Sequence, residues 1–472
     1  MSQMNQMDPA NQVKSVSQVK DLPMPKIWLF AIGQFGWALL SGIISNWLVY
    51  FYQPDQETIA QGQTVFVPQG LVVLGIVTVV GGITAFARFF DAFVDPAVAS
   101  LSDRCGSKAG RRMPFLMFAG IPLAIVTVLV FWSPVNGTSW VNAAFLFVTV
   151  IGYYIALTFY CTPYNALIAE LGHDSKQQLT ISTAISFTWV FGTAMAYVAP
   201  VIWGMFVPGL GRVNAIRLTF TIMACVAAVC MLVPPLTIRE RDYVNSQPTS
   251  ESTIESLKQT FRDGEFRKFV GSDVVYWVAI TTFQTGLPFF VTSLLKLPET
   301  TTTIYFVLMT GVSVLFYLPV NILANKVGKK RVLLAAFVVF TAAFAFAGAL
   351  GSDILGFLPP MAQGLVLSVA GAIPMAAFGI LPQAIVANIA DASSRTTGQD
   401  RQGMFYAART FAMKMGQSVA MLLFTGVSTI GVASGSGAGY RVAAICAAVL
   451  CGIGGVVFAF YNEHKVLDAL ER

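Results

Sequence analysis

The segment RFFDAFVDP, residues 88–96, places three charged residues inside an otherwise apolar run. Arg88, Asp91 and Asp95 are spaced i, i+3 and i+7, so in a helix all three lie on one face. A charge at the centre of a membrane helix costs about 2.5–3.5 kcal/mol, and such residues face a cavity or a partner. Two carboxylates one turn apart repel each other unless a cation, a proton or a basic neighbour such as Arg88 compensates them. The spacing therefore predicts a polar site for a monovalent cation or a shared proton.

Two further residues bear on this site. Pro96 leaves the carbonyl of Ala92 without its helical donor, which adds an oxygen ligand to the carboxylates. Lys414, in ARTFAMKMGQSVA, is the clear basic residue deep in a later apolar segment. It lies about eleven residues, or ~17 Å, into that segment, which is too deep for easy snorkelling to the interface. Because an intramembrane lysine needs an acidic partner, we expect Lys414 to pair with Asp91 or Asp95 and to join two parts of the chain.

The composition is that of an integral membrane protein. Of the 472 residues, 56% are hydrophobic and 11% charged, with a mean hydropathy of +0.68, whereas soluble domains average about 25% charged. The six cysteines form no CxxC pair, so neither a disulfide framework nor a Cys/His metal site is expected. Stretches long enough to cross a bilayer, at about 20 residues each, lie at 27–52, 70–101, 113–132, 140–168, 180–207, 213–236, 269–296, 301–324, 332–351, 357–389, 403–430 and 438–462.

The distribution of basic residues predicts the orientation of these twelve spans. Of the 29 Lys and Arg residues, 22 lie in the two tails and the even-numbered loops, and only four, Arg212, Arg217, Lys296 and Arg441, lie in the opposite loops or the span ends beside them. Both termini are therefore expected in the cytoplasm, with the chain crossing a cell membrane many times. Because these basic residues sit in short loops beside the spans, they give no reason to expect a nucleic-acid partner.

A polar segment and a faint repeat divide the chain in two. The loop SDRCGSKAGRRMPF follows the second span, and ANKVGKKRVLL follows the eighth, the equivalent place in a second group of six. The expected organisation is an N-terminal tail 1–26, a six-helix bundle 27–236, a linker 237–268, a six-helix bundle 269–462 and a C-terminal tail 463–472.

On these residues the chain resembles the glycoside–pentoside–hexuronide:cation symporters, the melibiose-permease-like branch of the major facilitator superfamily. The resemblance extends from the first span to the twelfth and is sharpest in RFFDAFVDP, in SDRCGSKAGRRMPF and in TPYNAL, residues 162–167. It implies an all-α membrane fold of twelve helices in two six-helix halves, related by an axis along the membrane normal.

The resemblance also implies roles for particular residues. It places the coupling cation, H⁺ or Na⁺, at Asp91 and Asp95, and it places Thr158, Lys414 and Arg88 in the same polar centre. No other cofactor is implied.

The chain departs from the melibiose carrier where that protein holds its sugar. Ala38 and Cys161 stand roughly where the carrier has aspartates, and Ile185 stands near an arginine position. The substrate is therefore not expected to bind as melibiose does, and the missing carboxylate at Cys161 favours protons over sodium. Sugars bind to planar rings, amides and hydroxyls. The residues expected to line the substrate cavity are Gln34, Trp37, Tyr160, Tyr164, Asn165, Gln284, Asn388 and Gln417.

The function expected from these features is cation-coupled symport of a small carbohydrate or glycoside by alternating access. We expect the transporter to act as a monomer in the bilayer. The alternative is a symporter of lysolipids or other amphiphiles with the same fold. An enzyme is not expected, because no nucleophile–base pair or HExxH motif is present. A sensor on the same scaffold would have little use for the aspartate pair.

Overall fold

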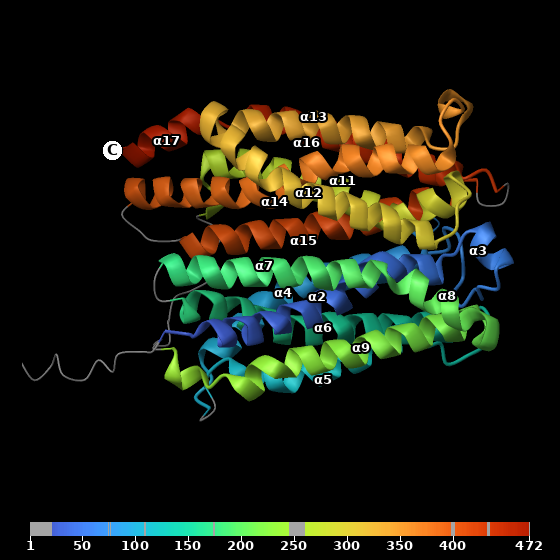
Figure 1. Cartoon of the computed structure of the whole chain (residues 1–472), viewed down its shortest axis with the longest axis horizontal. Coiled ribbons are helices and arrows are strands. Elements are labelled where there is room, and N and C mark those ends of the chain that lie inside the picture. The colour runs from blue at the N-terminus through green and yellow to red at the C-terminus, as the bar shows by residue number, and fades with distance from the viewer. Residues whose placement is uncertain are drawn as a thin grey trace, which may run out of the picture.

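The chain is a bundle of helices that run along one common direction, seen in a computed structural model (Figure 1). The structure describes residues 21–471 except 74, 76, 108–109, 173–174, 245–259, 398–401 and 432–434. All regular elements in these ranges are helices. Residues 1–20 of the predicted N-terminal tail and 245–259 of the predicted linker lie outside the described residues.

The helices fall into two sets that pack mainly within themselves. The first set is α2 (Met24–Tyr52), α3 (Gln56–Ala60), α4 (Val79–Asp103), α5 (Met113–Val130), α6 (Trp140–Leu171), α7 (Ser175–Tyr197), α8 (Ala199–Leu210), α9 (Arg212–Thr237) and η2 (Glu240–Asp242). The second set is α11 (Gly264–Phe289), η3 (Phe290–Leu294), α12 (Thr300–Val327), α13 (Lys329–Ala349), η4 (Asp353–Leu355), α14 (Pro360–Thr397), α15 (Gln402–Val427), α16 (Ala438–Ala459) and α17 (Glu463–Glu471).

The twelve predicted spans are found in these helices. Ten spans in the described part of the chain are long and apolar enough to cross a membrane. Helices α4 and α15 are also long enough, at 25 and 26 residues, and they are less apolar because they carry the charged site residues. Helices α7 and α8 form a single span, since Pro200 near the start of α8 interrupts the helix without ending the crossing.

Two predicted boundaries differ from the structure. Helix α4 begins at Val79, not near residue 70, because the Thr78 hydroxyl caps it by accepting a hydrogen bond from the Gly81 N–H at 3.0 Å. The segment predicted as a C-terminal tail is largely the helix α17, which packs on α14.

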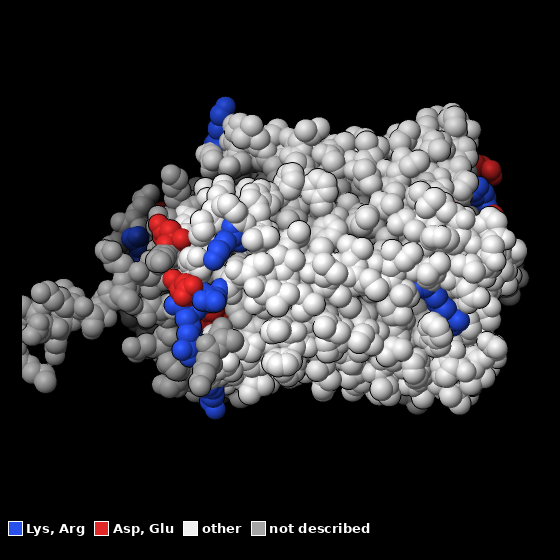
Figure 2. All heavy atoms as spheres, turned by 60° about the horizontal axis from the view of Figure 1, so that its bottom comes forward, with Lys and Arg blue, Asp and Glu red and all other residues white. Residues whose placement is uncertain are grey.

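The two ends of the bundle differ in charge. Helix α2 begins and α16 ends at one end, called here the terminal end, and α3 lies at the opposite or far end (Figure 1). Figure 2 shows an uncharged surface along the middle of the molecule, with most of the visible charged side chains gathered at the terminal end. An apolar belt between two charged ends is the surface that a bilayer requires.

The internal repeat has a structural counterpart at the terminal end. The Glu240 carboxylate, just after α9, accepts hydrogen bonds at 2.8–2.9 Å from three backbone N–H groups at the start of α5. The Glu463 carboxylate, just after α16, accepts two at 2.9 and 3.0 Å at the start of α13. Gly110 and Gly328, both with positive φ, precede these N–H groups, and a Cβ there would lie 2.3 and 2.9 Å from a carboxylate oxygen. The shared Gly-basic-basic pattern thus reflects two carboxylate caps that need a bare glycine backbone.

The stabilising role of the Glu463 cap can be tested by removing the charge of its carboxylate. We expect Glu463→Gln to lower the melting temperature of the detergent-purified protein by about 2–4 °C, since a lost cap costs about 1 kcal/mol. Asp468→Asn, at an exposed position of α17, is the matched control and should melt like the wild type. Equal melting of the two variants would contradict a stabilising role for the cap.

Candidate functional site

Lys414 lies between the two aspartates and joins the two sets of helices. Its Nζ is 2.7 Å from Asp91 Oδ2 and 2.5 Å from Asp95 Oδ2, and these three residues are called here the lysine fork. Helices α4 and α15, which carry these residues, pack directly on each other. The predicted pairing of the lysine with the aspartates is therefore confirmed, and both carboxylates take part.

Two hydroxyls of α6 hold the outer oxygens of the same carboxylates. Thr158 Oγ1 donates a hydrogen bond to Asp91 Oδ1 at 2.5 Å, and Thr162 Oγ1 donates one to Asp95 Oδ1 at 3.1 Å. Thr158 was expected here and Thr162 was not. The available signal was spacing, because the two threonines are four residues apart like the two aspartates, so two facing helices present matched pairs.

The two carboxylates differ in exposure. The Asp95 side chain is 27% exposed, whereas that of Asp91 is 5% exposed. Asp95 also lies one turn closer to the terminal end, because α4 runs toward that end. Asp95 is therefore both the more exposed carboxylate and the one nearer the terminal end.

Arg88 does not neutralise an aspartate, contrary to the expectation. Its Nη1 donates to Gln417 Oε1 at 2.5 Å, its Nη2 donates to Ser45 Oγ at 3.2 Å, and its guanidinium lies over the Tyr154 ring at 5.5 Å. Among the described residues it forms no ion pair. Side chains lean toward the N-terminus of their helix, so Arg88 points to the far end of α4 while both aspartates follow it toward the terminal end.

Two predicted substrate residues pack inside the first set of helices instead of lying beside the aspartates. Tyr160 and Tyr164 are completely buried. Their hydroxyls donate to the backbone carbonyls of Met231 and Phe30 at 2.9 and 2.8 Å. These contacts hold α6 against α9 and α2, and they use the only side-chain donor of each tyrosine.

The remaining predicted substrate residues are spread over the molecule. Gln417 contacts Arg88, and Gln284 is half-buried on α11. Asn165 is exposed near the terminal end of α6. Asn388 lies beside Lys329, whose Nζ is 2.8 Å from the amide oxygen when the amide is oriented to satisfy its neighbours.

Two predicted cavity residues and one further tryptophan each keep a buried polar atom without a partner among the described residues. They are Gln34 through Oε1, and Trp37 and Trp277 through Nε1. Trp277 was not predicted. Trp37 and Trp277 occupy the same position in the first helix of each set, thirteen residues after the start of α2 and of α11. The repeat of the two halves could therefore have predicted Trp277 from Trp37. Unpaired buried donors and acceptors of this kind are positions where the hydroxyls of a ligand can bind.

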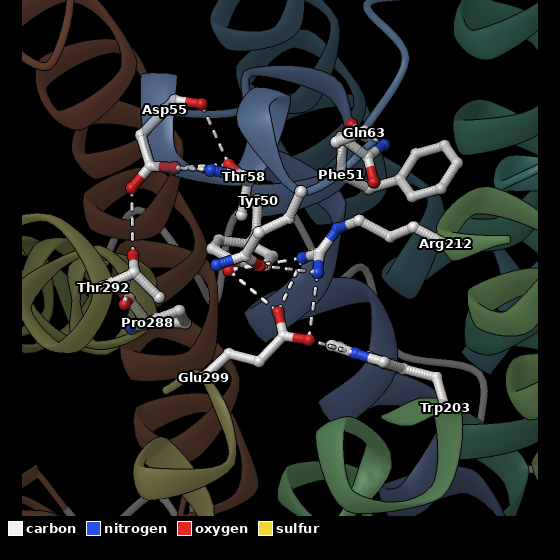
Figure 3. A network of polar contacts seen from close by, with 11 residues as sticks. Tyr50, Phe51, Asp55, Thr58, Gln63, Trp203, Arg212, Pro288, Thr292 and Glu299 are labelled. Carbon is white, nitrogen blue, oxygen red and sulfur yellow. Dashed lines mark hydrogen bonds and ion pairs between the residues drawn. The ribbon is translucent and has the colours of Figure 1, made fainter. Parts of the chain in front are cut away.

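A network around Glu299, which precedes α12, joins the two sets of helices at the far end (Figure 3). Its carboxylate accepts hydrogen bonds from Arg212 Nη2 at 2.6 Å, from Tyr50 Oη at 3.0 Å and from Trp203 Nε1 at 2.5 Å. All three donors belong to the first set of helices and Glu299 belongs to the second. One carboxylate, 12% exposed, therefore binds three elements of the opposite set.

Further contacts join the sets beside this network. Asp55 caps α3 and accepts a hydrogen bond from Thr292 Oγ1 at 2.9 Å (Figure 3). Gln53 Nε2 donates to the Thr425 carbonyl and to Ser428 Oγ, both at 2.9 Å. Together with the Glu299 network, these hydrogen bonds hold the two sets against each other at the far end.

Solved structures with this arrangement are membrane transporters. The nucleoside transporter NupG superposes with a TM-score of 0.60 at 14% identity, covering 95% of this chain and 100% of that one. A D-xylose–proton symporter superposes with a TM-score of 0.62 at 14% identity, covering 90% and 96%. The chain has the fold of the major facilitator transporters.

The family model described as MFS/sugar transport protein matches residues 29–460, so the chain belongs to this family. The uncharacterized symporter YjmB of Bacillus subtilis is 23% identical over 88% of this chain and 85% of its own length. The isoprimeverose transporter of Lactiplantibacillus pentosus is 24% identical over 58% of this chain, and the match spans about half of that protein, 54%. The resemblance to the glycoside–pentoside–hexuronide:cation symporters is confirmed, and the class is that of a transporter, not of an enzyme.

The lysine fork predicts a specific pattern of stability. Lys414→Ala leaves two carboxylates facing each other, and removing one partner of a buried pair costs about 3–5 kcal/mol. We expect a large drop in the melting temperature of the purified protein. Lys414→Ala combined with Asp95→Asn should recover at least half of that drop, because one of the unpaired charges is gone.

The control for this pair of variants is Lys296→Ala. Lys296 pairs with Glu57 at 2.8 Å on the exposed surface, where an ion pair contributes about 0–1 kcal/mol. If Lys414→Ala melts no lower than Lys296→Ala, the lysine fork is not a stabilising link.

Proposed function

We propose that the protein is a secondary active transporter that moves a small carbohydrate or glycoside together with H⁺ or Na⁺ by alternating access. The observation that carries this proposal is the position of Lys414 of one half between Asp91 and Asp95 of the other. Membership of the sugar-transport family and relatives named as symporters support it.

The geometry gives a route from ion binding to movement. A proton or cation that reaches the carboxylates competes with the Lys414 ammonium group for the same oxygens. Because the lysine belongs to the other half, its release changes what holds the two halves together at this level. Asp95, the more exposed carboxylate, receives the ion first, and the hydroxyls of Thr158 and Thr162 are already within reach as further oxygen ligands.

The charge distribution supports an orientation for this cycle. The tails and even-numbered loops hold 22 basic residues, against four in the opposite loops or beside them. We therefore assign the terminal end to the cytoplasmic side of a cell membrane. The far end then faces outside, and the contacts around Glu299 close the site to the exterior. From this orientation we infer a state that exchanges ions with the cytoplasm.

The coupling role is tested in proteoliposomes. Asp91→Asn and Asp95→Asn should each abolish gradient-driven accumulation, because each removes a charge that the ion must neutralise, while counterflow exchange survives in at least one variant. Asp353→Asn, at an exposed position of η4 at the far end, should accumulate substrate normally. Wild-type accumulation by both aspartate variants of α4 would contradict the assignment.

The same assay identifies the ion and the substrate type. We favour the proton, so a protonophore should stop uptake and sodium removal should not. The reverse result would assign sodium. Uptake of lysophosphatidylcholine in place of sugars would favour the amphiphile alternative.

The closed far end is tested by chemical labelling. In a cysteine-free background, Ser41→Cys lies deeper along α2 than the Glu299 network and should react slowly with a membrane-impermeant maleimide added outside. Glu299→Gln removes the charge that gathers Arg212, Tyr50 and Trp203, so labelling should accelerate about tenfold or more, the effect of a change of 1.4 kcal/mol. Lys296→Gln, which breaks an exposed pair at the same end, should leave the rate near that of the parent. Equal rates in all three proteins would contradict the seal or its orientation.

A further inference from the structure

A second buried ion pair lies inside the second set of helices. Arg409 of α15 donates two hydrogen bonds to Asp273 of α11, from Nε to Oδ2 at 2.9 Å and from Nη2 to Oδ1 at 3.1 Å. The two side chains are 10% and 4% exposed, and the guanidinium lies over the Phe269 ring at 6.0 Å. Two parallel hydrogen bonds from a planar guanidinium fix both the distance and the orientation of the two groups.

Arg409 and Lys414 point to different sides of α15. They are five residues apart, which is ~7.5 Å along a helix and ~140° around it. Lys414 reaches Asp91 and Asp95 of the first set, whereas Arg409 reaches Asp273 of its own set. The ammonium group of the lysine fork is therefore carried by a helix that has a charged contact on each side.

Helix α15 lies at the boundary between the two sets (Figure 1), and it packs on α4 about as extensively as on α11. On the α4 side, Ser418 Oγ donates to the Ala85 carbonyl at 2.7 Å. On the α11 side, Gly416 lies so close that a Cβ there would be 2.8 Å from the Val274 carbonyl oxygen. The extent of packing alone therefore does not decide which half α15 follows when the halves separate.

The ion pair with Asp273 can decide this, because it is the ion pair between α15 and α11 among the described residues. Stability alone does not require it, since well-packed apolar residues in place of a buried ion pair are often equally stable or more stable. Its geometry is specific, because a guanidinium and a carboxylate bind each other best in one planar arrangement. These two properties favour a role in positioning over a role in stability.

We propose that Arg409 and Asp273 are positioning residues that hold α15 on α11, and thereby set the place of the Lys414 ammonium group between the two aspartates. This inference rests on the proposed symport, in which an ion competes with Lys414 for the carboxylates. With α15 anchored to its own half, release of Lys414 lets the two halves separate. Without the anchor, α15 stays on α4 when the halves move, so ion binding no longer drives the movement.

The position of α15 is tested by distances between spin labels on the full-length protein in lipid nanodiscs, in a cysteine-free background. One label at the exposed position Ala407 of α15 is paired with a second at Arg267 of α11 or at Leu101 of α4, both also exposed. The parent protein should give a narrow α15–α11 distribution. Replacing the ion pair by apolar residues, Arg409→Met with Asp273→Leu, should make that distribution about twofold broader and leave the α15–α4 distribution narrow, because no charged contact then fixes α15 on α11.

Three further proteins separate positioning from folding. The charge-reversed pair, Arg409→Asp with Asp273→Arg, restores opposite charges and should narrow the α15–α11 distribution again. Arg409→Lys keeps the charge without the planar guanidinium, so it should give an intermediate width. Lys268→Met is the matched control, because Lys268 is 42% exposed and lies 3.0 Å from Glu265 near the start of α11, and it should leave the distribution unchanged. If the apolar pair does not fold, Arg409→Lys compared with Lys268→Met decides the question.

The consequence for transport is measured in proteoliposomes with xylose, glucuronate and methyl galactoside as probes. For a probe that the wild type accumulates, the apolar pair should retain counterflow exchange. Its ion-driven accumulation should fall about tenfold or more, the effect of a change of about 1.4 kcal/mol. A loss of stability alone would lower exchange and accumulation together, so the difference between the two reports on positioning.

The outcomes separate this inference from the proposed function. An α15–α11 distribution as narrow in the apolar pair as in the parent protein would overturn the anchoring role. Wild-type accumulation by the apolar pair would overturn its role in coupling and would leave sugar symport standing. If the wild type accumulates none of the probes under a proton or sodium gradient, that result counts against the proposed function itself, and the spin-label distances still test the anchor.

Discussion

A charge inside the hydrocarbon region must find its counter-charge within the protein, and here the decisive pair spans the two halves. Asp91 and Asp95 belong to α4 and Lys414 to α15, so the most polar point of the membrane interior is also a joint. A lysine in the same half would have neutralised the aspartates equally well, but it would have made their ionisation irrelevant to the arrangement of the halves. Because the Lys414 ammonium group comes from the other half, the ion pairs that neutralise the aspartates also hold the two halves together.

The contacts at the far end complement this joint because they are of a different kind. Glu299 is bound by three donors of the opposite half, and no mobile ion needs to displace it. In the proposed cycle, the joint at the centre responds to a cation, whereas the network at the far end responds only to the separation of the helices. The proposed transport cycle therefore uses two sets of contacts with separate chemistry.

The sequence predicted the elements that depend on local physics and missed those that depend on direction and packing. Twelve spans and the pairing of Lys414 followed from hydropathy and from the cost of buried charge. The predicted partner of Arg88 was wrong because spacing placed the three residues on one face, whereas Arg88 leans toward the N-terminus of α4, away from the aspartates that follow it. Tyr160 and Tyr164 were polar enough for a cavity, yet nothing in the sequence tells which side of α6 faces α2 and α9. Thr162 could be found only by matching the spacing of the two threonines with that of the two aspartates. Trp277 could be found only by aligning the second half of the chain with the first.

The cap on α13 has a consequence for how the protein is made. Glu240, the equivalent cap of the first half, is synthesised before any helix of the second half exists, so the first half can complete its terminal end early. Glu463 follows α16 in the chain, and with it come the buried Val466 and the Leu470 carbonyl that Arg395 contacts. The start of α13 must therefore wait, inserted but uncapped, until the chain has been translated past α16. A ribosome that stops just after the last hydrophobic span would release a chain with every span present and its second half unfinished.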